Sequence, residues 1–201
     1  MPSKATAAKP SARERLLAAA DELFYSEGVQ TVGIDRIVQK AGVAKASLYN
    51  LFGSKEELVQ AYLDARHANT RAQVERALTR FRTPRERLLG VFDAQGQLFT
   101  EPDFNGCAHM TASAEARPGS PVECATDRYR LWVRTLFTDL AQEAGIANPE
   151  DLARQLHLLY DGAGVSARMD RDPSAATTAR VAAAALFDAA ARNKELVDAG
   201  Q

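Results

Sequence analysis

Residues 33–55, GIDRIVQKAGVAKASLYNLFGSK, constrain the fold more than any other stretch, because they predict two short helices joined by a tight turn. Four apolar residues of the first half follow the i, i+3, i+4, i+7 spacing that places side chains on one helical face: Ile34, Ile37, Val38 and Ala41. Gly42 is expected to end this helix. A second helix follows over residues 45–51, so the pair is a candidate helix-turn-helix.

The second helix of this pair carries two different faces. At 100° per residue, Leu48 and Phe52 lie together on the side expected to pack against the first helix. The opposite face is small, polar and able to form hydrogen bonds: Ala46, Ser47, Tyr49 and Asn50. A helix of this kind is about 10 Å long at 1.5 Å per residue, a length that suits a DNA major groove.

Residues 41–58, AGVAKASLYNLFGSKEEL, resemble the DNA-binding core of the TetR family of bacterial transcriptional regulators. The resemblance rests on the Ala-Gly-Val turn, the Leu-Tyr pair and the Phe-x-Ser-Lys exit, and it is close over residues 11–66. In that family the motif is followed at once by a long helix that opens with a Ser-Lys-Glu run. The resemblance implies contacts to DNA by Gly33, Lys45, Ala46, Ser47, Tyr49, Asn50 and Lys55, with Tyr49 and Lys55 on phosphates.

Three positions depart from the family pattern. Val32 and Ala44 stand where side chains that cap helices are usual. Each costs about 1 kcal/mol unless, for the first helix, Thr31 or Gly33 provides the cap. Leu51 stands where a histidine that binds phosphate is common, which removes one expected backbone contact.

Charge is distributed unevenly along the chain. The 201 residues carry 25 Lys and Arg against 26 Asp and Glu, a net charge of −1, which argues against bulk electrostatic binding of nucleic acid. Residues 1–55, however, hold eight basic and five acidic side chains and are net positive. The basic end is therefore the end that carries the motif, as recognition of nucleic acid requires.

The sequence predicts a cytoplasmic protein with no membrane association. It has no run of about 18 apolar residues, and its N-terminus lacks the apolar middle of a signal peptide. In such a compartment Cys107 and Cys124 are expected to be free thiols rather than a disulfide.

The remaining chain reads as helices only. Ser11 is expected to begin the first helix and Gly28 to end it, while an S-x-x-E capping box at Ser54 opens a helix to about residue 80. Proline after a capping residue marks four further starts: Thr83-Pro84, Ser120-Pro121, Asn148-Pro149 and Asp172-Pro173. With a short helix over residues 105–116 and no strand pattern, the prediction is an all-α fold of about nine helices.

We expect three regions along the chain. Residues 1–10 form a disordered tail that is either solvated or in contact with phosphates. Residues 11–57 form the three-helix DNA-binding domain, and residues 58–201 form a larger helical domain for effector binding and dimerisation. Helices over about 149–169 and 173–193 are expected to form a four-helix bundle in a homodimer, as in the family, or else an intramolecular hairpin.

Candidate ligand-binding residues lie in the second domain. Four aromatic residues, one cysteine and one histidine could line an effector pocket or belong to a plain core: Phe92, Phe99, Cys107, His109, Trp132 and Tyr160. Cys107-Ala-His109 lacks the paired spacing of an ordinary zinc site, so we predict neither a metal nor a cofactor.

Cys107 carries a sharper hypothesis. Residues 104–115, FNGCAHMTASAE, are similar to a Gly-Cys segment in a branch of the family that includes quinone- and oxidant-responsive repressors. If Asn105 caps the short helix, Cys107 is its second residue, where free N–H groups favour a thiolate. The alternative is a small, buried apolar residue. Cys124 is a candidate resolving partner for a sensing thiol.

The resulting functional prediction is a one-component regulator, a repressor that a small-molecule or electrophilic effector releases from a palindromic operator on double-stranded DNA. The alternative is a DNA-independent α-helical enzyme or small-molecule-binding protein. No G-x-S-x-G, P-loop, dinucleotide-binding glycine motif or H-E-x-x-H occurs, so we predict no catalytic residues.

Overall fold

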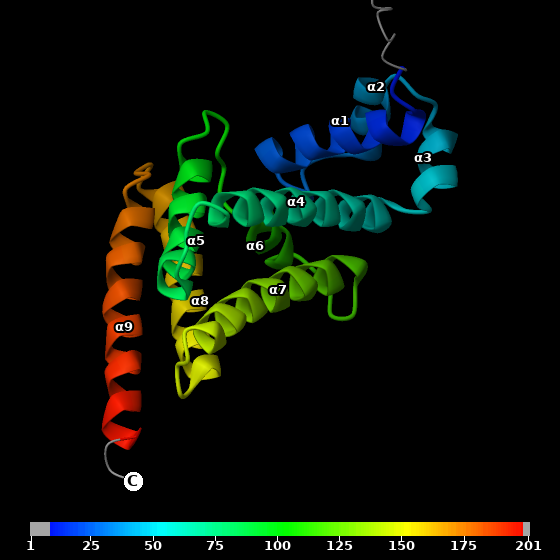
Figure 1. The fold of residues 1–201 in the computed structure, drawn as a ribbon. Coiled ribbons are helices and arrows are strands. Elements are labelled where there is room, and N and C mark those ends of the chain that lie inside the picture. Colours follow the sequence, from blue (N-terminus) through cyan, green and yellow to red (C-terminus); the bar gives the residue numbers. More distant parts are fainter. Residues whose placement is uncertain (1–8, 199–201) are drawn as a thin grey trace, which may run out of the picture.

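The computed structural model describes residues 9–198, and the side chains of residues 9–192. That part of the chain contains nine helices and no strand, which confirms the all-α prediction (Figure 1). The helices are α1 (Ala12–Glu27), α2 (Ile34–Ala41), α3 (Lys45–Phe52), α4 (Lys55–Leu78), α5 (Pro84–Phe99), α6 (Ala108–Ser113), α7 (Pro121–Glu143), α8 (Pro149–Met169) and α9 (Ala175–Asp198). The predicted disordered tail lies, at residues 1–8, outside the described part.

Among the described helices, complete capping boxes form at α1 and α5, whereas Asn148 makes no side-chain hydrogen bond at the start of α8. Ser11 and Glu14 make a complete capping box at α1, and Thr83 makes one with Glu86 at α5. At α4 the Ser54 hydroxyl accepts a hydrogen bond of 3.1 Å from the backbone N–H of Glu57. At α7 the carboxylate of Glu123 accepts from the backbone N–H of Gly119 at 2.6 Å, one residue before the Ser120 cap.

Two predicted helix starts, those of α6 and α9, are wrong because nearby side chains bond elsewhere. The carboxylate of Asp172 accepts from the backbone N–H of Ser174 at 2.9 Å, and this turn delays the start of α9 from residue 173 to residue 175. The short helix α6 begins at residue 108 rather than 105, since the Asn105 amide bonds to α1 instead of capping.

Helix α4 links the two hydrophobic cores of the protein. Its first half, with Leu58 and Tyr62, packs with α1, α2 and α3 in one core, which α6 and the start of α7 also join. Its second half, with Val74 and Leu78, belongs to the larger core built with α5, α7, α8 and α9. In Figure 1, α4 crosses the molecule with α1–α3 at one end and α5, α8 and α9 at the other. A change in the tilt of α4 therefore moves both regions.

Candidate nucleic-acid interface and ligand cavity

The turn between α2 and α3 depends on the backbone of Gly42. This residue adopts φ 62°, a left-handed conformation that glycine reaches without strain, and its N–H bonds to carbonyls of the last turn of α2. Gly33, in extended backbone, is the residue that caps α2, and Ala44 caps α3, both without a side-chain bond. Leu48 is fully buried, and it docks α3 against the α1–α2 pair.

The opposite face of α3 is presented to solvent, as the sequence pattern predicts. Lys45, Ala46 and Asn50 are exposed, Tyr49 is 45% exposed, and Ser47 is half-buried. Their roles in binding DNA stay predictions, but the surface they would use is open.

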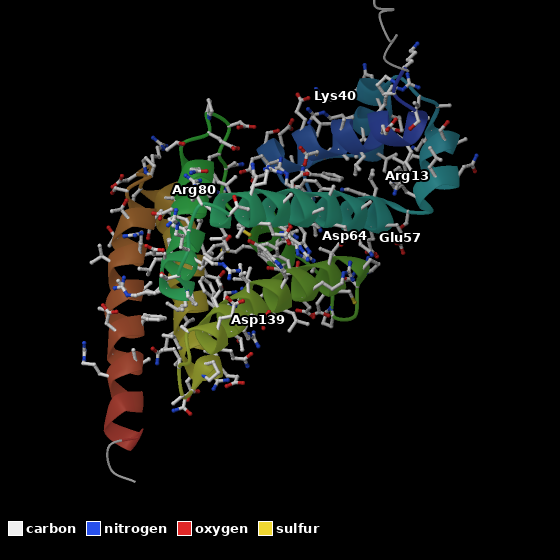
Figure 2. All side chains as sticks on the ribbon, in the orientation of Figure 1. Arg13, Lys40, Glu57, Asp64, Arg80 and Asp139 are labelled. Atoms are coloured by element: carbon white, nitrogen blue, oxygen red, sulfur yellow. The ribbon has the colours of Figure 1, made fainter. Side chains whose placement is uncertain are left out.

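Basic side chains around α3 are held by carboxylates on the protein surface. Lys45 Nζ lies 2.9 Å from Asp35 Oδ1, and this carboxylate raises the pKa of Lys45. Lys40 pairs with Glu22 at 2.6 Å, and the guanidinium of Arg13 lies 5.2 Å from the centre of the Phe52 ring. In Figure 2, Arg13 and Lys40 lie at the end of the molecule formed by α1–α3. Surface ion pairs of this kind are weak, so a phosphate can replace the carboxylate.

Lys55 lies in a different environment from the exposed cations. Its Nζ donates a hydrogen bond of 2.7 Å to the backbone carbonyl of Val29, and burial lowers its pKa. The residue thus ties the start of α4 to the loop after α1. A phosphate contact by Lys55 stays a prediction.

A cavity of about 310 Å³ lies between α1, α4, α5, α6, α7, α8 and the segment before α6. Four of the six predicted pocket residues line it: Phe99, Cys107, His109 and Tyr160. Phe92 is fully buried in the core, with its ring centre 5.6 Å from that of Phe137. Trp132 packs against His67, with ring centres 5.2 Å apart. Neither of these two aromatic residues belongs to the cavity wall.

Sequence reasoning missed the polar part of the wall. Arg66 of α4 and Asp21 of α1 form a two-pronged ion pair there, with N···O distances of 2.6 and 3.0 Å. The Arg66 guanidinium also lies 3.6 Å from the centre of the Tyr25 ring. The polar part of the wall also contains Gln95 of α5 and Tyr129 of α7, together with Asn69, Thr70 and Gln73 of α4. Since these side chains come from four helices, only tertiary packing brings them together.

Tyr25 connects α1 to the segment that precedes α6. Its hydroxyl donates to the carbonyl of Gly106 at 3.1 Å and accepts from the backbone N–H of Asn105 at 2.9 Å. The Asn105 side-chain amide donates to the Tyr25 carbonyl at 2.7 Å. The segment before α6 and helix α1 are therefore joined by three hydrogen bonds, in addition to the connection through α4.

The expected thiolate at Cys107 does not fit its surroundings. Cys107 is the N-cap of α6 rather than its second residue, because the helix starts later than predicted. Burial raises the pKa of the Cys107 thiol, and this outweighs the lowering by the N–H groups of Met110 and His109. Cys107 is half-buried and Cys124 is exposed.

The cavity wall includes His109, whose pKa is strongly shifted. Burial lowers its pKa to about 4, so the imidazole is neutral at pH 7. Its ring stacks on Tyr129 with centres 4.1 Å apart and an angle of 8° between the planes. Among the described residues no group of three or more His, Cys, Asp and Glu side chains is arranged to hold a metal ion.

Large apolar side chains lie exposed on the two C-terminal helices. Leu158, Val165 and Met169 share one face of α8, and Val181 lies on α9. We refer to these four as the α8–α9 apolar face. Met169 is 76% exposed and Leu158 is 74% exposed. Within residues 9–198 no helix is long and apolar enough to span a membrane.

Comparisons with known proteins all match this chain to transcriptional regulators. The family profile described as "Bacterial regulatory proteins, tetR family" matches residues 16–62. A TetR-family transcriptional regulator from Streptomyces coelicolor is 33% identical, with a TM-score of 0.83 over 89% of this chain and 95% of that chain. The HTH-type transcriptional repressor NemR of Escherichia coli is 28% identical over 79% of this chain and 85% of its own length.

A third relative matches only in part. The HTH-type transcriptional activator FasR of Mycolicibacterium smegmatis is 39% identical over 94 residues, which is 47% of this chain. That match spans 42% of the length of FasR.

Proposed function

Since this chain belongs to the TetR family, as its likeness to the Streptomyces coelicolor regulator along nearly the whole of both chains shows, we propose that it is a homodimeric transcriptional repressor. In this proposal α3 reads a palindromic operator in the bacterial cytoplasm, and an effector in the cavity releases the protein from DNA. We propose no catalytic role, because the relatives are named as regulators. The repressor NemR, which matches over most of its length, supports repression rather than activation.

The open face of α3 is the observation that carries this proposal. Buried Leu48 fixes the rotation of α3, and that rotation turns Lys45, Tyr49 and Asn50 toward solvent. In this proposal Lys45 and Asn50 contact base edges, while Tyr49 and Lys55 hold phosphates. The surrounding exposed cations exchange their carboxylate partners for phosphates on binding.

Dimerisation through α8 and α9 is supported by the α8–α9 apolar face. Its side chains are too exposed to stabilise a monomer, and those of α8 share one helical face that a second copy can cover. The exposed positions of α9 beside Val181 include Ala185 and Ala189, and such small residues allow helices to approach closely.

The position of the cavity supports release by an effector. A ligand there touches α1, α4 and the segment before α6 at once. Helix α4 belongs to both cores, and Tyr25 of α1 bonds to residues 105 and 106. A ligand that favours one arrangement of these elements would therefore also change the distance between the two α3 helices of a dimer.

The experiment selects operator from a pool of random DNA with the purified protein and measures affinity by fluorescence anisotropy at physiological salt. Asn50→Ala should relax the preference at one base pair, at a cost of about 1–3 kcal/mol for a lost two-pronged contact. Lys45→Ala should weaken binding at least fivefold.

Arg71→Ala is the matched control for Lys45→Ala. Both residues are exposed cations that pair with a carboxylate, but Arg71 lies sixteen residues along α4 from its start, about 24 Å at 1.5 Å per residue. Equal weakening by the two substitutions would show that α3 does not read DNA. Failure to enrich any sequence would favour a DNA-independent ligand-binding protein.

A further inference from the structure

The cavity wall contains a buried amide whose oxygen lacks a partner. Gln95 of α5 is 5% exposed, and its Nε2 donates to the carbonyl of Tyr160 at 2.8 Å, which fixes the orientation of the amide. Its Oε1 has no hydrogen-bond partner within the described part of the chain. A buried acceptor without a donor costs free energy, so this oxygen is suited to a donor group of a ligand.

A second acceptor of the same kind lies in the wall. His109 is 4% exposed, and its Nε2 has no partner among residues 9–198. Because burial keeps the ring neutral at pH 7, one of its nitrogens must present a lone pair rather than a proton. Nε2, which has no partner in the described part of the chain, can accept a hydrogen bond in the tautomer that carries the proton on Nδ1.

The charges of the wall cancel locally. Arg66 is paired with Asp21, and Asp161 is paired with Arg130 of α7 at 2.8 Å. Glu101, the remaining charged residue of the wall, is exposed to solvent. A charged ligand would thus enter a half-buried space without a free counter-charge, which disfavours its binding.

Aromatic side chains form part of the remaining wall, beside the polar residues Asn69, Thr70 and Gln73 of α4. Phe99 and Phe104 lie with ring centres 4.9 Å apart at one side, and Tyr129 and Tyr160 approach through their hydroxyls at 3.5 Å at another. A volume of about 310 Å³ is at the small end of sites for organic ligands. Flat rings fit between such walls by offset or edge-to-face contact.

From these observations we infer that the cavity binds an uncharged aromatic molecule of one or two rings, whose hydroxyl groups donate hydrogen bonds to Gln95 Oε1 and His109 Nε2. The inference rests on the proposed function in one respect, since it names the class of the effector. It differs from the electrophile hypothesis because it requires no bond to Cys107.

The test uses three probes that share one ring system and differ in one group: 2-naphthol, 2-methoxynaphthalene and 2-naphthoate. Calorimetry at pH 7 should show that 2-naphthol binds once per protomer and at least tenfold more tightly than the other two. Equal affinity for 2-methoxynaphthalene would overturn the role of the donor. Tighter binding of 2-naphthoate, or no binding of 2-naphthol, would overturn the ligand class.

Two variants locate the site. Gln95→Met and His109→Phe each remove one acceptor and keep a side chain of similar size, and at least one should weaken 2-naphthol at least fivefold while leaving 2-methoxynaphthalene within twofold. Gln97→Met is the matched control, because Gln97 is on the same helix, exposed and outside the wall of this cavity. Thermal unfolding confirms that each variant is folded. If the affinity of both folded variants for 2-naphthol is unchanged, the inference fails.

Binding of operator is measured separately, without probe. If operator binds and 2-naphthol does not, the ligand class is wrong while the proposed repressor stands. If 2-naphthol binds through Gln95 or His109 and operator is never bound, the ligand class stands and the proposed function fails.

Discussion

Cys107 illustrates how the surroundings of a residue decide its chemistry. The N–H groups of Met110 and His109 do face its sulfur, as a position near a helix start predicts, but burial has the larger effect and raises the pKa of the thiol. The thiol form therefore dominates at neutral pH, and Cys107 acts as part of the cavity wall.

We expect iodoacetamide at pH 7 to modify Cys107 at least tenfold more slowly than Cys124, because only Cys124 is exposed and only thiolates react. Mass spectrometry of the matched single-cysteine proteins, Cys124→Ser and Cys107→Ser, measures the two rates. Faster modification of Cys107 would restore the hypothesis of an electrophile sensor. In that case release of operator by a quinone should disappear in Cys107→Ser.

His109 makes stability depend on pH. Burial lowers its pKa from 6.5 to about 4, so between these values the unfolded chain binds more protons than the folded chain. The free energy of unfolding should therefore fall as the pH drops from 6.5 toward 4, by roughly 3 kcal/mol from this residue. Urea unfolding at fixed protein concentration, from pH 4.5 to 7, measures this slope.

His109→Phe should show a clearly shallower slope over this range. Burial also lowers the pKa of His67 and of His157, and both remain in the variant, so the difference between the two proteins reports His109 together with its interaction with His67. Identical slopes would mean that His109 titrates normally in the folded protein.

Among the elements, those whose boundaries are set locally could be predicted from the sequence. The ends of α1 and the starts of α4, α5 and α7 depend on a cap and a first-turn residue only a few positions apart. The start of α6 could not be predicted, since Asn105 bonds to Tyr25, 80 residues away. The lining of the cavity could be predicted only in part, because it also depends on contacts between distant residues. The sequence shows which residues are aromatic, but only packing decides that Phe99 lies in the wall and Phe92 in the core.

The contact of α1 with the segment before α6 gives an element-scale prediction. Tyr25→Phe removes the hydroxyl that bonds to residues 105 and 106, and should lower the free energy of unfolding by about 1–2 kcal/mol. Tyr49→Phe, at the exposed hydroxyl of α3, should change stability by less than about 0.5 kcal/mol while weakening operator binding. Urea unfolding and fluorescence anisotropy measure the two effects. Similar stability of both variants would show that the Tyr25 bonds contribute nothing to folding.

At the scale of the whole molecule, the proposed function requires a fixed separation of the two α3 helices, because half-sites of a palindrome lie about one helical turn of DNA apart or a multiple of it. One protomer supplies one α3, so a second copy is required. The α8–α9 apolar face is suited to a two-fold interface. In such an interface both protomers bury their copy of each exposed side chain.

Leu158→Glu and Met169→Glu should therefore convert the protein to a monomer. Burial of one such side chain contributes about 1.5–3 kcal/mol, and two-fold symmetry doubles the loss, so the dissociation constant should rise at least a hundredfold. Sedimentation equilibrium measures this change, and the variants should keep their helical circular dichroism but lose affinity for the full operator. Leu131→Glu is the control, since Leu131 is 61% exposed on α7, outside this face. If Leu131→Glu dissociates the dimer and Leu158→Glu does not, the protomers meet through a different surface, and the separation of the reading helices must be derived anew from that surface.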